Sequence, residues 1–64
     1  MWDREIQASV DRSRLDEWLA RIADGDVGAE TGAAKLLAVG MQRGTFTEAD
    51  ARRVAQAIAE AAVA

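Results

Sequence analysis

The chain has 64 residues without cysteine or histidine, so disulfides are excluded and any metal site would have to rest on carboxylates alone. Eleven acidic residues against eight basic ones give a formal net charge of −3, which argues against nonspecific nucleic-acid binding through clustered Lys and Arg. A chain this short buries only about 60% of the surface that its unfolded form exposes, so we expect a partner or a second copy to add stability.

Residues that could carry chemistry are sparse. Without a histidine, the serines and threonines have no base to activate them as nucleophiles, and they suit helix caps better. The segment DGD at 24–26 lacks the downstream ligands and the terminal glutamate of a calcium loop. We therefore expect a non-enzymatic protein with no catalytic residues, no cofactor and no metal.

Nothing in the sequence predicts attachment to a membrane. The opening segment MWDRE is acidic, and no apolar run approaches the roughly 18 residues that a membrane-spanning helix needs. We expect neither a signal peptide nor a membrane span, and hence a cytoplasmic protein.

The first ten residues, MWDREIQASV, alternate between apolar and polar side chains. The apolar positions are Trp2, Ile6, Ala8 and Val10. Such alternation favours a half-buried strand, and because the chain holds no second strand candidate, this strand would have to pair with another copy or with a partner. We predict an extended arm or short strand over residues 1–10. Disorder and a helix capped by Asp3, with Ile6 and Val10 one turn apart, are the open alternatives.

A first helix is predicted over residues 11–24. Its apolar positions recur at helical spacing on one face, and they are Leu15, Trp18, Leu19 and Ile22. Asp11 is expected to be the N-cap, with Val10 packed before it, and Gly25 to end the helix. Trp18 lies in the middle of the apolar face and is expected to belong to the core.

A second helix is predicted over residues 28–43, after the connector DGDVG. Its apolar positions are Ala33, Leu36, Leu37, Gly40 and Met41, and Gly44 is well placed as its C-cap. The interior glycines Gly32 and Gly40 each cost about 1 kcal/mol relative to alanine. We interpret them as points of close packing against a neighbour rather than as ligand contacts.

A third helix is predicted over residues 47–63. Thr47 is its expected N-cap, Asp50 completes a weak capping box, and Phe46 packs in front of the cap. The apolar stripe is narrow and consists of Ala51, Val54, Ala55, Ile58, Ala61 and Ala62. Such small side chains bury little apolar surface, so this helix should pack tightly on the first two helices or lie along a partner. The predicted fold is mainly α, a small domain of three helices preceded by an extended arm or short β-strand.

A strand followed by two helices, as in IQASV, DRSRLDEWLARI, DGDVG and AETGAAKLLAVGMQ, resembles the ribbon-helix-helix family of DNA-binding proteins. This family includes antitoxins and small phage repressors. The resemblance covers about residues 5–42 of the chain. It implies that two chains form a ribbon that enters the major groove, with Glu5, Gln7 and Ser9 outward. Arg4, Gln7 and Ser9 would then be the nucleic-acid contacts. Glu5 departs from the pattern, since phosphates repel a carboxylate.

The preferred interpretation is a non-enzymatic protein-interaction module that binds stoichiometrically. It would act as a homodimer, as a subunit of an assembly or as a phage-type inhibitor, and a DNA-binding repressor or antitoxin is the alternative. The candidate contacts are Trp2 and Ile6 on the arm, and Val54 and Ile58 on the third helix. Trp2 is included because tryptophan anchors are over-represented at binding hot spots.

Overall fold

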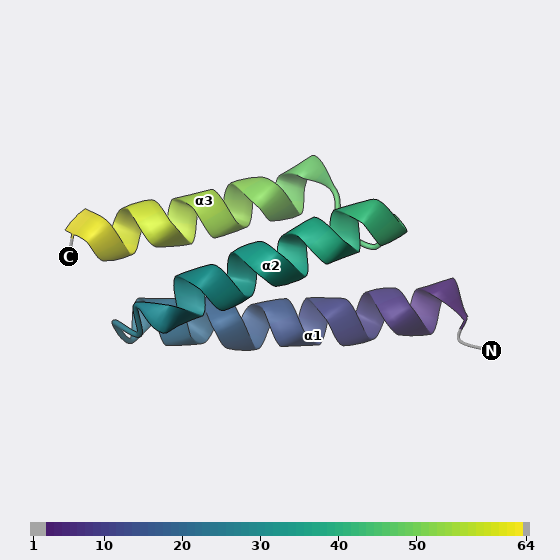
Figure 1. Ribbon diagram of the computed structural model, residues 1–64, viewed down its shortest axis with the longest axis horizontal. Helices are drawn as coiled ribbons and strands as arrows, with labels where there is room; N and C mark the ends of the chain where they lie inside the picture. Colours follow the sequence, from purple (N-terminus) through teal and green to yellow (C-terminus); the bar gives the residue numbers. More distant parts are fainter. Residues whose placement is uncertain (1–2, 64) are drawn as a thin grey trace.

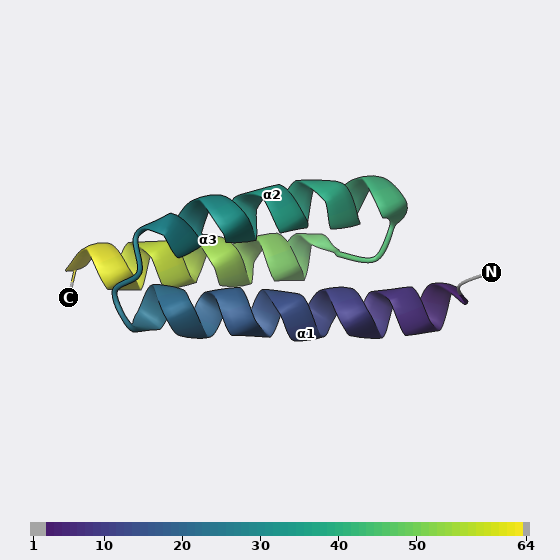
Figure 2. The same cartoon turned by 60° about the horizontal axis from the view of Figure 1, so that its bottom comes forward.

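The computed structural model describes residues 3–63, which form three helices, α1 (Arg4–Ala23), α2 (Gly28–Arg43) and α3 (Glu48–Val63). The helices lie side by side, and α2 runs antiparallel to both α1 and α3 (Figure 1). The bundle is elongated, measuring 41 × 18 × 14 Å over its Cα atoms. The start of α1 and the end of α3 project beyond their neighbours at opposite ends (Figure 2). The mainly α prediction is confirmed, and no helix within residues 3–63 is both long and apolar enough to cross a membrane.

The predicted extended arm is wrong where the chain is described, because residues 4–10 are helical. Trp2 lies outside the described residues. Asp3 is the N-cap of α1, and its Oδ1 accepts a hydrogen bond of 3.2 Å from the amide of Glu5. A helix satisfies its backbone groups within the segment, whereas a lone strand leaves them without partners. The helical alternative for this segment therefore describes the structure.

Asp11 is not an N-cap, since it lies well inside α1 with its side chain in the interior at 0% exposure. Its carboxylate accepts hydrogen bonds from Gln7 Nε2 at 2.9 Å and from Thr45 Oγ1 at 2.7 Å. The half-exposed guanidinium of Arg43 lies 3.9 Å away. The predicted helix start was wrong because the core-facing position at this turn of α1 is occupied by a polar residue, which interrupts the apolar spacing.

The core is small and draws on all three helices and the loop before α3. Its buried apolar residues are Leu15, Ile22, Ala29, Ala33, Phe46 and Val54. A ring of partly buried residues packs on them, namely Trp18, Leu19, Leu36, Leu37, Ala57, Ile58 and Ala61. The apolar face predicted for the first helix is confirmed. Met41 is an error in the prediction for the second, since its side chain is 45% exposed and lies outside the core.

The two interior glycines of α2 are sites of close packing, as predicted. A Cβ at Gly32 would lie 2.7 Å from the ring of Trp18, and one at Gly40 would overlap the ring of Phe46. Both aromatic rings therefore lie directly on the α2 backbone. Gly44 ends the helix in the left-handed conformation with φ 79°, which a side chain would disfavour.

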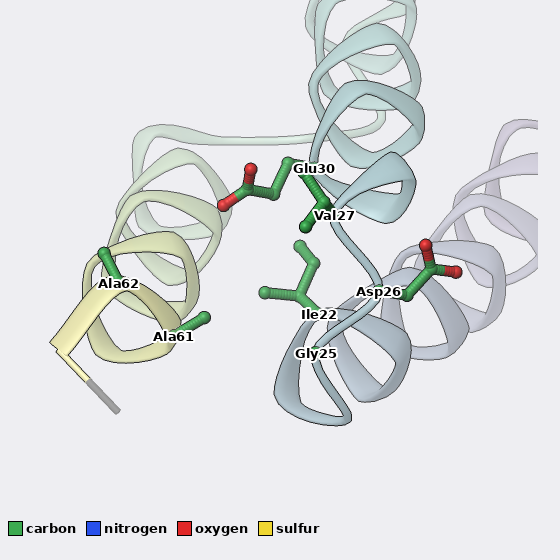
Figure 3. A pocket seen from close by; sticks show the side chains of 7 residues that line it. All are labelled: Ile22, Gly25, Asp26, Val27, Glu30, Ala61 and Ala62. Carbon is green, nitrogen blue, oxygen red and sulfur yellow. The ribbon is translucent and has the colours of Figure 1, made fainter.

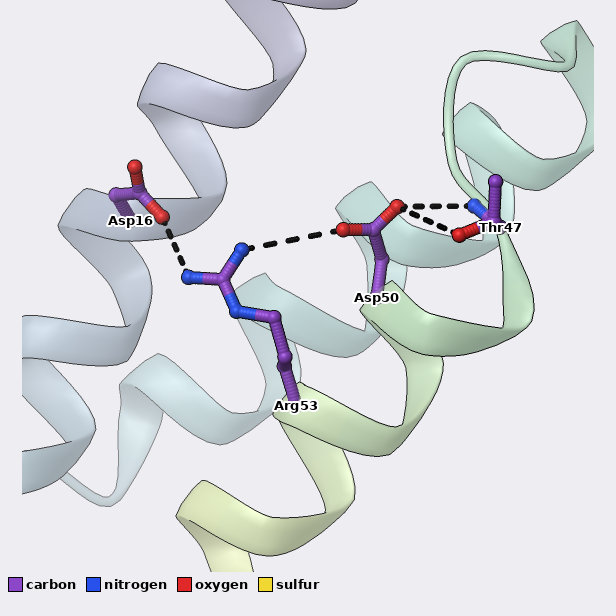
Figure 4. A network of polar contacts seen from close by, with 4 residues as sticks. All are labelled: Asp16, Thr47, Asp50 and Arg53. Carbon is purple, nitrogen blue, oxygen red and sulfur yellow. Dashed lines mark hydrogen bonds and ion pairs between the residues drawn. The ribbon is translucent and has the colours of Figure 1, made fainter.

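The start of α3 is fixed by the Asp50 half of the predicted capping box and by a link to α1 (Figure 4). The hydroxyl of Thr47, the predicted N-cap, donates to the same carboxylate at 3.3 Å. Asp50 Oδ2 accepts from the amide of Thr47 at 2.9 Å, which is one half of a capping box. Arg53 donates to Asp16 of α1 at 2.8 Å, and its other terminal nitrogen lies 3.9 Å from Asp50. This chain of charges connects the cap of α3 to the outer side of α1.

Candidate functional site

One end of the bundle brings together the turn between α1 and α2, residues 24–27, and the last turn of α3, residues 61–63; we call it the turn end (Figure 3). Gly25 turns the chain with φ 90°, a left-handed conformation that favours glycine. Asp26 Oδ1 then accepts from the amide of Gly28 at 3.1 Å and holds the entry into α2. The turn is thus locally determined, and it leaves the side chain of Val27 77% exposed.

Two hollows open at the turn end, and both border Ala61 of α3. The first has a volume of about 180 Å³ and is lined by Ile22, Gly25, Asp26, Val27, Glu30, Ala61 and Ala62 (Figure 3). The second has a volume of about 220 Å³ and is lined by Ala23, Ala57, Glu60 and Ala61. Both hollows remain open because α3 is rich in alanine, whose methyl group does not reach across the space that a leucine side chain would fill.

Acidic residues are among those that line these hollows. Asp26 and Glu30 border the first and Glu60 the second, and none of the described residues that line either hollow is basic. Glu60 is exposed and accepts a hydrogen bond of 3.2 Å from Gln56 Nε2, one turn earlier in α3. The hollows therefore combine an apolar floor with the carboxylates of Glu30 and Glu60, whereas the side chain of Asp26 points away from the first hollow and accepts from the amide of Gly28 (Figure 3).

Exposed apolar side chains add to the same end of the molecule. Val27 is 77% exposed in the turn, and Val63 is 89% exposed as the last residue of α3. Exposed apolar residues scattered singly are normal on a protein surface. Here both lie at the turn end, and Val27 also lines the first hollow, so a partner bound there would contact Val27 and the hollow together.

The residues predicted to contact a partner do not form one exposed surface. Ile6 is 50% exposed and lies five positions before Asp11, which at about 100° per residue turns it away from the core. Val54 belongs to the core at 3% exposure, and Ile58 packs against the core, so neither presents a free side chain. The start of α1 and the second half of α3 also lie at opposite ends of the bundle (Figure 1).

The residues of the nucleic-acid alternative lie on a helix rather than on a ribbon. Arg4, Gln7 and Ser9 all fall within α1, where period-two alternation no longer places side chains on one face. The amide of Gln7 donates to the carboxylate of Asp11 and is therefore engaged within the protein. The described residues contain no strand that could supply the ribbon.

A third hollow, of about 290 Å³, lies on α1 beside Trp18 and is lined by Arg14, Glu17, Trp18 and Arg21. The guanidinium of Arg21 lies over the Trp18 ring, 5.1 Å from its centroid. All four residues come from one helix, so this hollow is a gap between neighbouring side chains. Trp18 itself packs on Gly32 and is accounted for by the fold.

Sequence reasoning missed the residues of the turn end. Val27, an apolar residue inside a glycine-rich turn, was a usable signal, because such a residue has little chance of reaching the core. The alanines of α3 were recognised as a poor source of burial. The hollows, however, also depend on how α3 packs beside α1 and the turn between α1 and α2, which no local pattern reports. Among residues 3–63 no cluster of three or more acidic side chains is arranged to hold a metal ion.

Comparison with known proteins adds no functional information. The chain matches no protein-family model, no curated protein and no solved structure.

Proposed function

We propose that this chain is a small cytoplasmic protein-interaction module that acts by stoichiometric binding, with the turn end as its main contact surface. One observation carries the proposal, namely the balance of buried and exposed apolar side chains. Those buried and larger than alanine are Leu15, Ile22, Phe46 and Val54. The large ones left exposed are Ile6, Val27, Val39, Met41 and Val63.

Burial of these exposed groups would add appreciably to a marginal stability. Fully burying a valine side chain is worth about 1.5 to 3 kcal/mol, against a total of about 5 to 15 kcal/mol for a typical folded domain. Val27 lines the first hollow, and Val63 lies in the last turn of α3 at the same end of the bundle. A partner bound at the turn end can therefore bury Val27, fill this hollow and reach Val63 at its edge.

The acidic residues of the turn end influence which kind of partner binds there. A symmetric homodimer places the same surface on both subunits, so a contact through two turn ends would bring the acidic residues of one subunit, Asp26, Glu30 and Glu60, close to the same acidic set of the other. Opposed like charges are strongly unfavourable at an interface. We therefore propose a different protein as the occupant of the turn end, with this chain as an assembly subunit or a small inhibitor.

Affinity capture from extracts of the cells that make the protein tests this function. The bait is the full chain, alongside a variant in which Val27→Ser and Val63→Ser are combined. Val39→Ser is the matched control, because Val39 is 42% exposed but lies toward the other end of α2. We expect one protein to be recovered in a stoichiometric amount with the wild type and with the control, and not with the double variant.

Two outcomes would contradict the proposal. Recovery of no protein in stoichiometric amount would remove the interaction function. Equal recovery with all three baits would remove the turn end as the contact surface.

A further inference from the structure

We propose that the second half of α3, residues 55–63, is a lid that unwinds locally from the bundle and uncovers Ile22, while the first half of the helix stays in place. We call this segment the α3 lid. The inference goes beyond the proposed function, because it concerns an opening of the chain by itself and holds with or without a partner.

The first half of α3 is anchored to the rest of the protein by apolar and polar contacts. Val54 is buried at 3% exposure, and Phe46, in the loop before the helix, is buried at 4%. Asp50 is buried and caps the helix. Arg53 donates to Asp16 of α1 at 2.8 Å. Up to residue 54, α3 is therefore tied to its neighbours by a buried side chain, a cap and an ion pair.

The α3 lid lacks anchors of these kinds. None of its described residues is fully buried, and Ala57, Ile58 and Ala61 are only partly buried against the core. Among residues 3–63, the only hydrogen bond between side chains that involves the lid joins Gln56 to Glu60, and both belong to α3. No polar side-chain contact within this range therefore ties the lid to α1 or α2.

Two hollows reduce the packing of the lid further. Each is lined by the lid together with α1 or with the turn between α1 and α2, and their volumes are about 180 and 220 Å³. Atoms that border an unfilled space lose the dispersion contacts that close packing provides. The end of α3 also projects beyond its neighbours (Figure 2), and Val63 is 89% exposed. The lid therefore gains less from packing than the half of the helix before it.

The lid opens by unwinding rather than by swinging as a rigid helix. From Glu48 to Val63 the sequence has no glycine or proline at which a helix would bend sharply. A helical segment this short is marginal in water without tertiary packing, whatever its alanine content. Weakly packed segments of this kind open at a lower free energy than the whole domain unfolds.

Opening of the lid changes the exposure of Ile22. Its side chain is 1% exposed, although it lines the first hollow beside Ala61 and Ala62 (Figure 3). Ala57, Ile58 and Ala61 pack against the core cluster to which Ile22 belongs. With the lid unwound, this core side chain becomes accessible from the turn end. The lid thus controls access to Ile22.

Native-state hydrogen exchange of the purified full chain, followed by NMR, tests the lid. The amides of Ala59 in the lid and Leu19 in α1 are compared, because each lies four residues before the last residue of its helix and is affected alike by ordinary end fraying. We expect the protection factor of Ala59 to be lower by about tenfold or more. Residues 52–54 should be protected as strongly as Leu19. Equal protection of Ala59 and Leu19 would overturn the inference.

A single thiol measures the exposure of position 22 directly. The chain has no cysteine, so Ile22→Cys carries one reactive group. Leu15→Cys is the matched control, since Leu15 is equally buried and adjoins Asp16, the partner of Arg53. With an aromatic disulfide reagent, Ile22→Cys should react about tenfold or more faster than its own global unfolding allows. Leu15→Cys should react no faster than its global unfolding allows. The same limit for both variants would contradict the lid.

Filling the hollows should hold the lid closed. Ala61→Leu adds bulk at a residue that borders both hollows, whereas Ala59→Leu adds the same side chain at an exposed position that lines neither. We expect Ala61→Leu to raise the protection of the Glu60 amide about tenfold and Ala59→Leu to leave it unchanged. An equal effect of the two leucines, or no effect of Ala61→Leu, would show that the hollows do not loosen this part of α3 and would overturn the inference.

Discussion

The hydroxyl of Thr45 donates a hydrogen bond of 2.7 Å to the carboxylate of Asp11, joining the middle of α1 to the loop that precedes α3. Both side chains are buried, at 6% and 0% exposure. Thr45 Oγ1 also lies 3.1 Å from the carbonyl of Gly40, but a hydroxyl has one proton and the shorter contact is to the charged acceptor. A polar contact thus occupies the place in α1 where an apolar residue would be expected.

The first prediction concerns the strength of this contact. A double-mutant cycle with Asp11→Ala and Thr45→Val should give a coupling energy of about 1.5 to 3 kcal/mol, because a buried hydrogen bond to a charged group is lost. Urea denaturation of the four proteins measures it. Ser13→Ala, at an exposed position one half-turn away, is the control and should change the free energy of unfolding by less than about 0.5 kcal/mol. A coupling energy near zero would show that the contact does not stabilise the fold.

The second prediction concerns Gly40. Alanine is the better helix former by about 1 kcal/mol, yet Gly40→Ala should destabilise the protein by about 1 to 3 kcal/mol, because its Cβ would overlap the ring of Phe46. Gly28→Ala is the control, since its Cβ meets only Asp26 Oδ1 at an ordinary 3.4 Å. Thermal and urea unfolding measure both. A Gly40→Ala protein as stable as the wild type would mean that Phe46 does not pack on this backbone.

The third prediction separates two acidic residues that share Arg53 (Figure 4). Asp50→Ala should cost about 1 kcal/mol, because the amide of Thr47 loses its side-chain acceptor. Asp16→Asn should cost less than about 1 kcal/mol, since both partners of its ion pair with Arg53 are at least half exposed. Only the Asp16 effect should fade as salt is added. An Asp16 effect that is large and independent of salt would contradict this assignment.

The fourth prediction concerns the valines of the turn end. Combined Val27→Ser and Val63→Ser should change the free energy of unfolding of the isolated chain by less than about 0.5 kcal/mol per site, because both side chains are largely exposed. Urea denaturation of the purified chain measures this. A larger loss would indicate that these valines serve the fold and would weaken their assignment to a contact surface.

Sequence patterns predicted the parts of the fold where apolar spacing and caps agree. Leu15 and Ile22 at helical spacing, the left-handed Gly44 and the contact of Asp50 with Thr47 were all foreseeable from local rules. The start of α1 was not, because a buried Asp11 looks like a cap in a sequence. The burial of Asp11 depends on the hydrogen bond from Thr45, 34 residues away in the sequence, and no local sequence pattern indicates that contact.

The candidate site was harder to predict than the fold. Val54 was assigned to a partner surface because an alanine-rich stripe leaves its packing undetermined, and the structure places it in the core. The hollows of the turn end are lined by residues from α1, the turn between α1 and α2, and α3, so they are a property of several elements at once. Val27 in its glycine-rich turn was the one local sign of it.

The stability of the chain in the presence of its purified partner tests the central claim most directly. A ligand that binds only the folded state at a hundred times its Kd raises the free energy of unfolding by about 2.7 kcal/mol. We predict a gain of this size for the wild type and none for the chain that combines Val27→Ser with Val63→Ser. An equal gain for both chains, or none for either, would contradict the claim that the turn end binds a partner.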